Sequence, residues 1–265
     1  MSDSALAARL ADLRAARRTA LIPYITAGYP GPDETTAFLR GAAAAGADAV
    51  ELGVPWSDPV ADGPTIQAST HAALQQGTTL ARTLALLAGA RADVPVVVFT
   101  YLNPVLAHGA ARFAADAKRA GAAGLLVTDL PVGADDAVER DLLSAGLPLV
   151  RLVAPTTPPR RRRAIAEGSQ GFLYLIARLG VTGESGALSS VLGEQVAALR
   201  AVSDLPIAVG FGISSPEQAA AVAAYADGVV IGSAVVSRMG RGGAAEALGW
   251  LRTVRAALDA RRAGA

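Results

Sequence analysis

Two carboxylates, Glu51 and Asp62, stand out in the sequence ELGVPWSDPVADGP. Glu51 lies between two apolar residues of a short hydrophobic run, where an ionised carboxylate is costly unless it is paired or functional. A functional role is favoured, because carboxyl groups with perturbed pKa values gather in active sites, although a structural ion pair would also explain the position. Asp62 is open to two interpretations, a catalytic residue or the cap of a helix that begins at Pro64.

Two glycine-rich turns, GFGISS (210–215) and IGSA (231–234), follow the last two hydrophobic runs of the chain. Backbone N–H groups in such turns, together with a helix N-terminus, can bind a phosphate, and glycine allows the close approach. Glycine could also serve only to end the strands and turn the chain. The presence of two such turns favours a phosphate site.

The segment RLGVTGESGALSS (178–190) has the length and composition of a mobile lid, and equally those of a surface loop. The two histidines, His71 and His108, are isolated and lack the spacing of metal ligands, so the sequence predicts no metal site. The run Arg160 to Arg163 falls at a predicted helix start, and a solvated helix face explains it better than a nucleic-acid patch.

Eight short apolar runs alternate with eight longer segments of helical pattern. A further amphipathic helix is predicted at the N-terminus. The runs are residues 21–27, 49–54, 94–102, 124–130, 147–153, 171–177, 205–212 and 227–234. This order predicts an α/β fold, a (β/α)8 TIM barrel in one domain that spans residues 1–265. An open doubly wound sheet is less favoured, because the first turn lacks a G-x-G-x-x-G motif. In a barrel the active site lies where the strands end, near Glu51 and Asp62.

Composition excludes several classes of protein. With 24 basic and 23 acidic side chains the net charge is +1, which gives no overall field for nucleic acid or a membrane surface. The chain has no cysteine, which rules out disulfides and thiolate sites and is compatible with a cytoplasmic location. Its N-terminus lacks the apolar core of a signal peptide, and its most apolar segment, residues 219–237, is interrupted by Asp227 and by glycines.

Seven motifs spread over nearly the whole chain resemble those of the tryptophan synthase α subunit family and follow one another in the same order. They are YITAGYP (24–30), ELGVPWSDPVADGPTIQAS (51–69), TYLNPV (100–105), DLP (129–131), GFLYLIARLGVTG (171–183), PIAVGFGISSPEQ (206–218) and ADGVVIGSA (226–234). The resemblance implies a lyase of tryptophan biosynthesis that cleaves indole-3-glycerol phosphate to indole and glyceraldehyde 3-phosphate by a retro-aldol reaction. It also implies that this chain needs no cofactor, since pyridoxal phosphate belongs to the β subunit.

The resemblance implies distinct roles for the two acids. Glu51 matches the family's acid and base, and Asp62 matches the carboxylate that binds the indole N–H. Thr182 matches a lid residue that meets the Asp62 position when the loop closes. The other expected substrate-binding residues are Tyr24, Phe99, Tyr101, Tyr174 and Phe211 around the indole and glycerol groups, and Gly183, Gly212, Gly232 and Ser233 around the phosphate.

The expected partner is a β subunit, bound in an α2β2 heterotetramer. Its expected contacts on this chain are Trp56, Ser57, Asp58, Pro59, Asn103, Pro104, Asp129 and Pro131. Trp56 could instead be a local hydrophobic plug. Three alternatives stay open: a lyase that works alone and releases free indole, a barrel retained mainly as a regulatory partner, and another phosphate-binding barrel enzyme such as a sugar-phosphate isomerase. The last would leave PWSDPVADGP unexplained.

Overall fold

Eight parallel strands close into a barrel in the computed structural model, which describes residues 4–177, 185–210 and 212–263. The strands pair in chain order, and β8 returns to pair with β1. They are β1 (Ala20–Thr26), β2 (Val50–Gly53), β3 (Val96–Thr100), β4 (Gly124–Val127), β5 (Leu149–Val153), β6 (Leu173–Ile176), β7 (Ile207–Gly210) and β8 (Gly228–Ile231). The predicted (β/α)8 barrel is therefore confirmed.

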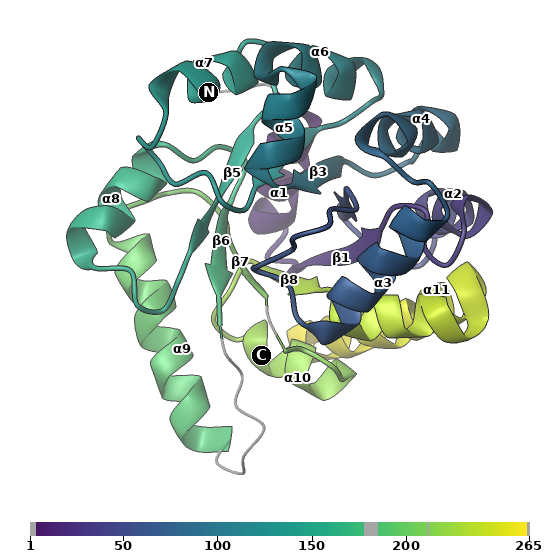
Figure 1. The fold of residues 1–265 in the computed structure, drawn as a ribbon. Helices are drawn as coiled ribbons and strands as arrows, with labels where there is room; N and C mark the ends of the chain where they lie inside the picture. The colour runs from purple at the N-terminus through teal and green to yellow at the C-terminus, as the bar shows by residue number, and fades with distance from the viewer. Residues whose placement is uncertain (1–3, 178–184, 211, 264–265) are drawn as a thin grey trace.

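Helices surround the barrel, as Figure 1 shows. They are α1 (Ala5–Ala15), α2 (Pro32–Gly41), α3 (Pro64–Gln75), α4 (Leu80–Ala90), α5 (Leu102–His108), α6 (Ala110–Arg119), α7 (Asp136–Leu143), α8 (Pro159–Glu167), α9 (Ser185–Arg200), α10 (Pro216–Val222) and α11 (Ser233–Ala263). The described residues thus hold two helices more than the sequence predicts, because the connections after β2 and β3 each contain two. Nowhere in this described part is a helix both long and apolar enough to cross a membrane.

The extra N-terminal helix closes one end of the barrel. Leu6, Leu10 and Leu13 of α1 are buried together with interior residues of the strands, such as Ile22 and Val150. Their spacing places them on one face of the helix. In Figure 1 α1 lies behind the strands, so the viewer looks into the opposite, open end of the barrel. The loops that follow the strands gather at that open end.

Glu51 belongs to the interior of the barrel. Its neighbours Val50 and Leu52 pack in the outer core between strands and helices, and alternate residues of a strand point to opposite faces. The pairing of β1 with β2 sets Tyr24 beside Glu51, and the pairing of β2 with β3 sets Val97 on its other side. The barrel interior therefore holds a carboxyl group between the side chains of Tyr24 and Val97.

The strands are shorter than the hydrophobic runs suggest. The run 94–102 predicts a strand through Leu102, but β3 ends at Thr100 and α5 begins at Leu102. The Oδ1 atom of Asp129, in the loop after β4, accepts a hydrogen bond from the Leu102 N–H group at 2.6 Å. This contact satisfies an N–H group that has no partner within α5. A tertiary interaction therefore helps the chain to leave the strand and begin a helix before the apolar run is complete.

Candidate active site

Glu51 is buried without a hydrogen-bond partner for one of its carboxyl oxygens. The residue is 1% exposed, and its Oε1 atom contacts no donor among the described residues. Burial raises the pKa of its carboxyl group from 4.5 to about 8, because the apolar surroundings disfavour the charged form. At neutral pH Glu51 is therefore mainly protonated, which allows it to donate a proton and then to take one back.

Asp62 lies in the loop between β2 and α3 and is held by the phenol group of Tyr101. The Tyr101 hydroxyl donates to Asp62 Oδ2 at 3.0 Å, and it accepts from the Ala61 N–H at 3.1 Å. Burial raises the pKa of Asp62 to about 6, and the hydrogen bond from Tyr101 opposes this shift. Asp62 is therefore mainly ionised at neutral pH. The two acids differ in protonation there, as a proton donor and a charge-stabilising carboxylate must.

The helix-cap interpretation of Asp62 is wrong. Helix α3 begins at Pro64 with Gly63 as its cap residue, and no side chain in the described part of the protein caps it. The carboxylate of Asp62 instead turns to Tyr101, and its backbone carbonyl accepts from the Gln67 side chain at 2.8 Å. The Asp-Gly-Pro turn thus starts the helix without using the Asp side chain, which leaves it free to face the barrel mouth.

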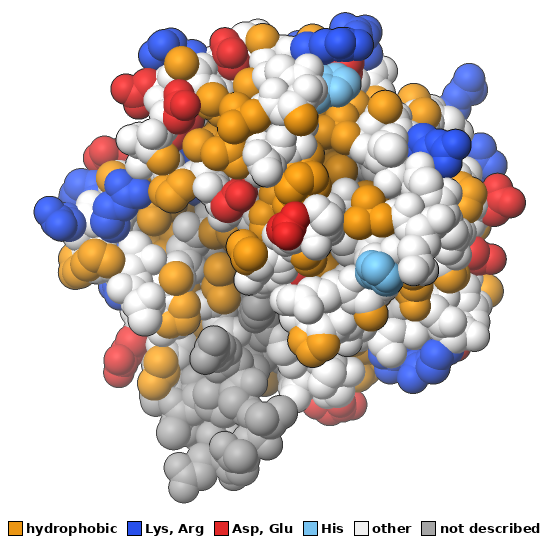
Figure 2. Space-filling model, in the orientation of Figure 1, with side chains coloured by type: hydrophobic (Ala, Val, Ile, Leu, Met, Phe, Trp, Pro, Cys, Tyr) orange, Lys and Arg blue, Asp and Glu red, His pale blue; other side chains and the backbone are white. Residues whose placement is uncertain are grey.

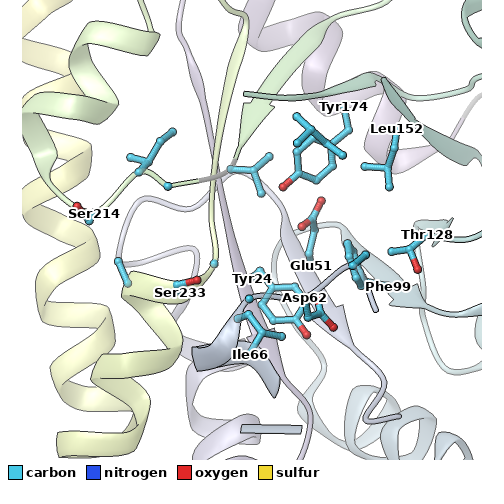
Figure 3. Close-up of a pocket in the computed structure, with 18 residues that line it drawn as sticks. Tyr24, Glu51, Asp62, Ile66, Phe99, Thr128, Leu152, Tyr174, Ser214 and Ser233 are labelled. Atoms are coloured by element: carbon cyan, nitrogen blue, oxygen red, sulfur yellow. The ribbon is translucent and has the colours of Figure 1, made fainter. Parts of the chain in front are cut away.

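Both acids line a cavity of about 440 Å³ at the open end of the barrel. Figure 3 shows the Glu51 carboxyl group directed into it, with Tyr174 on one side and Tyr24 and Phe99 on the other. The rings of Tyr24 and Phe99 meet edge to face, with centroids 5.2 Å apart. These aromatic walls suit a flat apolar ring, and they exclude the water that would otherwise stabilise an ionised Glu51.

The opposite wall of the cavity consists of the turns after β7 and β8. Gly212 and Ser214 come from the first turn, and Gly232 and Ser233 come from the second. The Gly232 carbonyl accepts the first backbone hydrogen bonds of α11, so the early N–H groups of this helix have no carbonyl partner within it. Such a helix start attracts a phosphate. In Figure 3 Ser214 and Ser233 lie on one side of the cavity and the two acids on the other.

Most of the predicted site residues within the described chain meet in this cavity. Those that line it are Tyr24, Glu51, Asp62, Phe99, Tyr174, Gly212, Gly232 and Ser233. Tyr101 is not one of its lining residues, and it acts from behind Asp62 through its hydroxyl group. Thr182, Gly183 and Phe211 lie outside the described residues, as does most of the predicted lid.

Several residues that line the cavity are absent from the sequence-based prediction. They are Ala61, Gly63, Ile66, Thr128, Leu152, Ile176 and Val230, whereas Ile213, Ser214 and Ala234 belong to the two glycine-rich turns that the sequence predicts. Thr128 directly follows β4, and Ile176 ends β6, so their position at strand ends could have indicated them. Ile66 lies on α3, and no local signal in the sequence distinguishes it from the other apolar residues of that helix.

The expected partner-contact residues occupy the rim of the barrel mouth. Ser57, Asp58, Asn103, Asp129 and Pro131 are exposed, whereas Pro104 is buried and has little surface to offer a partner. Trp56 and Pro59 are half-buried, and with α3 they line a groove of about 430 Å³. Trp56 therefore borders an open groove. In Figure 2, which shows this face, basic side chains lie mainly at the periphery and hydrophobic ones gather nearer the centre.

The histidines make local contacts. His71 hydrogen-bonds Gln75 at 3.0 Å, and His108 pairs with Asp116 at 2.7 Å. Among residues 4–177, 185–210 and 212–263 there is no cluster of three or more His, Cys, Asp or Glu side chains suited to a metal ion.

Known proteins match this chain closely in sequence and in structure. The family described as Tryptophan synthase alpha chain matches residues 10–257. The alpha chain of Gluconacetobacter diazotrophicus is 46% identical over 89% of this chain and 87% of its own length. That of a Picosynechococcus species is 47% identical over 91% and 92%.

Solved structures agree with this assignment. Tryptophan synthase subunit alpha from Legionella pneumophila superposes with a TM-score of 0.89 and 34% identity, over 97% of this chain and 99% of that one. A tryptophan synthase structure from Mycobacterium tuberculosis superposes with a TM-score of 0.86 and 37% identity, over 96% and 99%. The chain therefore belongs to the tryptophan synthase alpha chain family, lyases of tryptophan biosynthesis that cleave indole-3-glycerol phosphate.

Proposed function

We propose that Glu51 and Asp62 divide the work of the reaction this chain performs, the retro-aldol cleavage of indole-3-glycerol phosphate to indole and glyceraldehyde 3-phosphate. One observation carries this assignment: both acids face a single aromatic cavity, and burial separates their pKa values to about 8 and about 6. Two carboxyl groups with values pushed apart in this way suit a proton donor and an anionic stabiliser.

The proposed reaction begins with protonated Glu51. Its proton goes to indole C3, and the ring nitrogen takes up positive charge, which the Asp62 carboxylate stabilises through the N–H group. Glu51, now ionised, then removes the proton of the side-chain hydroxyl next to C3. The carbon–carbon bond breaks, its electron pair returns to the ring, and the hydroxyl carbon becomes the aldehyde. Glu51 ends the cycle protonated again, so the protons balance.

The remaining walls hold the substrate in place. Tyr24, Phe99 and Tyr174 bind the indole ring, and the turns that contain Gly212, Gly232 and Ser233 bind the phosphate. Thr182, Gly183 and Phe211 complete the pocket and its lid in this proposal. Every step uses side chains of this chain, so the proposed mechanism employs neither a metal nor an organic cofactor.

The partner in this proposal is a β subunit that carries pyridoxal phosphate, in a cytoplasmic α2β2 complex that receives the indole. Two features support a docking surface at the barrel mouth. Val60 lines the same groove as Trp56 and is 82% exposed, so a partner docked in this groove would bury its apolar side chain. The loops after β3 and β4 add the exposed Asn103, Asp129 and Pro131 nearby.

The discriminating experiment measures indole release from indole-3-glycerol phosphate with and without the β subunit. Weak release that rises strongly when the β subunit is added supports the subunit role. High release alone, with no gain on adding the β subunit, supports a lyase that works alone. The Glu51→Gln variant is the blank for both measurements, and wild-type turnover in that variant contradicts the proposed acid–base role.

A further inference from the structure

A second cavity lies at the end of the barrel opposite the active site. It measures about 590 Å³ and is bordered by the end of α1, the segment that leads into β1, and the last turns of α11. Among the residues that the structure describes, four arginines line it, Arg17, Arg18, Arg255 and Arg261, together with a single acidic residue, Asp259. The proposed mechanism uses none of these residues.

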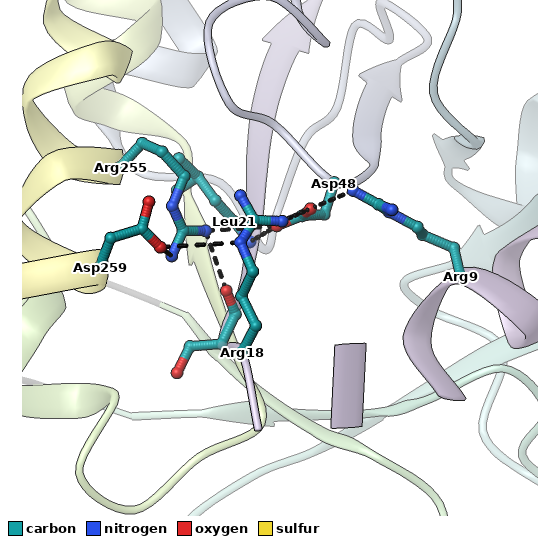
Figure 4. A network of polar contacts seen from close by, with 7 residues as sticks. Arg9, Arg18, Leu21, Asp48, Arg255 and Asp259 are labelled. Atoms are coloured by element: carbon teal, nitrogen blue, oxygen red, sulfur yellow. Dashed lines mark hydrogen bonds and ion pairs between the residues drawn. The ribbon is translucent and has the colours of Figure 1, made fainter. Parts of the chain in front are cut away.

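Behind this wall a fully buried aspartate holds the inner arginines in place, as Figure 4 shows. Asp48 Oδ1 accepts from Arg9 and from Arg18, each at 2.7 Å. Asp48 Oδ2 accepts from the Leu21 N–H at 3.0 Å and lies 3.3 Å from Arg255 Nη1. This network fixes two guanidinium groups of the cavity wall before any ligand arrives, so they need no reordering to bind one.

Positive charge exceeds negative charge in this cluster. Asp259 pairs with Arg255 at 2.7 Å and lies 3.6 Å from Arg18, so together with Asp48 it balances two of the three arginines in the network. Arg17 and Arg261 form no ion pair within the described part of the chain and add two further charges. Three positive charges therefore remain unbalanced, in a protein whose total charge is +1.

An unsatisfied donor belongs to the same wall. Arg255 is 7% exposed, and its Nε atom is buried without a hydrogen-bond partner among the described residues. A buried donor without a partner is costly, and such a group in a folded protein calls for an explanation. Arg17 sits at the end of α1 with a left-handed φ of 50°, a position where glycine is the usual residue.

We propose that this cavity is a second anion site, which binds a small phosphate-bearing molecule through Arg17, Arg18, Arg255 and Arg261. One guanidinium group can donate two parallel hydrogen bonds to two phosphate oxygens. A multiply charged phosphate group also offsets the excess positive charge of the arginines better than a single carboxylate does. The volume lies within the range of roughly 300–1,000 Å³ that is usual for sites of small molecules, and it leaves room for an organic group beyond the phosphate.

The probe for this site is inorganic pyrophosphate, titrated by calorimetry into the full-length chain at fixed ionic strength, because salt screens surface charges. The double variant Arg17→Gln/Arg261→Gln removes the two unpaired charges and leaves the Asp48 network intact. The matched control is Arg160→Gln/Arg163→Gln, which removes two exposed charges from α8. Unchanged melting curves and unchanged indole release show that each variant is folded.

We expect the wild type and the control to bind pyrophosphate at this site with the same affinity. In Arg17→Gln/Arg261→Gln the affinity of the site for pyrophosphate should fall at least tenfold, or binding there should disappear. The active site can also bind pyrophosphate, but neither pair of substitutions touches it, so that binding is common to all three proteins. If all three bind pyrophosphate with the same stoichiometry and affinity, or if the control loses as much as the double variant, the proposal is wrong. Failure here leaves the proposed roles of Glu51 and Asp62 untouched.

Discussion

The hydroxyl group of Tyr101 donates a hydrogen bond to Asp62 Oδ2 at 3.0 Å, although 38 residues lie between the two in the sequence. The same hydroxyl oxygen accepts from the Ala61 N–H, so Tyr101 ties the loop after β2 to the end of β3. The carboxylate is thereby held at the wall of the cavity with one oxygen satisfied. This relationship makes Tyr101 a positioning residue for Asp62.

Replacing Tyr101 by Phe is expected to lower kcat about tenfold, since a hydrogen bond to a charged group contributes about 1.5–3 kcal/mol and Asp62 is partly exposed. The hydrogen bond from Tyr101 lowers the pKa of Asp62, so its loss should also move the acidic limb of the pH profile to higher pH. Indole release measured from pH 5 to pH 9 checks both effects. Tyr225→Phe is the matched control, and a Tyr101→Phe profile identical to that of the control rules out the positioning role.

Glu51→Gln is expected to reduce indole release by about 10²–10⁴-fold, the usual contribution of a general acid and base. The amide has nearly the same shape but cannot exchange the proton. Binding of glycerol phosphate, measured by calorimetry, should stay within about twofold of wild type, since the phosphate turns lie on the opposite wall. Loss of binding together with turnover would point to a structural role for Glu51.

The same variant should change how stability depends on pH. The pKa of Glu51 rises from 4.5 to about 8 on folding, so the stability of the native state falls as pH rises from about 4.5 to about 8. Glutamine does not titrate and removes this slope, whereas Asp62 titrates in both proteins and cancels in the comparison. The melting temperature of Glu51→Gln minus that of wild type should therefore increase from pH 5 to pH 8.5 by at least about 2–4 °C, the equivalent of about 1 kcal/mol. A constant difference would mean that Glu51 is not protonated in the folded protein.

The plot of kcat/KM against pH should be bell-shaped, with limbs near pH 6 and pH 8. Below about 6 Asp62 gains a proton and no longer stabilises the ring charge, and above about 8 Glu51 loses the proton that it must donate. Asp62→Asn should lower activity about 10²–10³-fold and abolish the acidic limb while the basic limb stays. An acidic limb that persists in Asp62→Asn would assign that limb to another group.

Val60→Asp should leave indole release without the β subunit unchanged and weaken the stimulation by that subunit at least tenfold. Val60 is 82% exposed at the proposed docking surface, and burying such a side chain contributes about 1.5–3 kcal/mol. Val191→Asp, at an exposed valine on α9, is the matched control. Titration of each variant with the β subunit gives the comparison, and full stimulation of Val60→Asp would place the partner elsewhere.

Much of the active site could be predicted from local patterns. Glu51 is conspicuous because the residues on either side of it are apolar, and the two glycine-rich turns are recognisable from composition alone. Both predictions depend on a few neighbouring residues. Asp62 could not be assigned in this way, since a turn, a helix cap and a catalytic acid all tolerate Asp before Gly-Pro, and only its contact with Tyr101 shows where the side chain points.

The sequence by itself determined the eight strands and their order, because the alternation of apolar runs and helical segments is a local property of the chain. The tertiary structure decided where elements end and which distant groups meet. Asp129 accepts a hydrogen bond from the Leu102 N–H at the start of α5. Asp48 binds Arg9, Arg18 and Arg255, which are spread over almost the whole chain. Such contacts have no local signature, since they form only when the barrel closes and the buried charges must find partners.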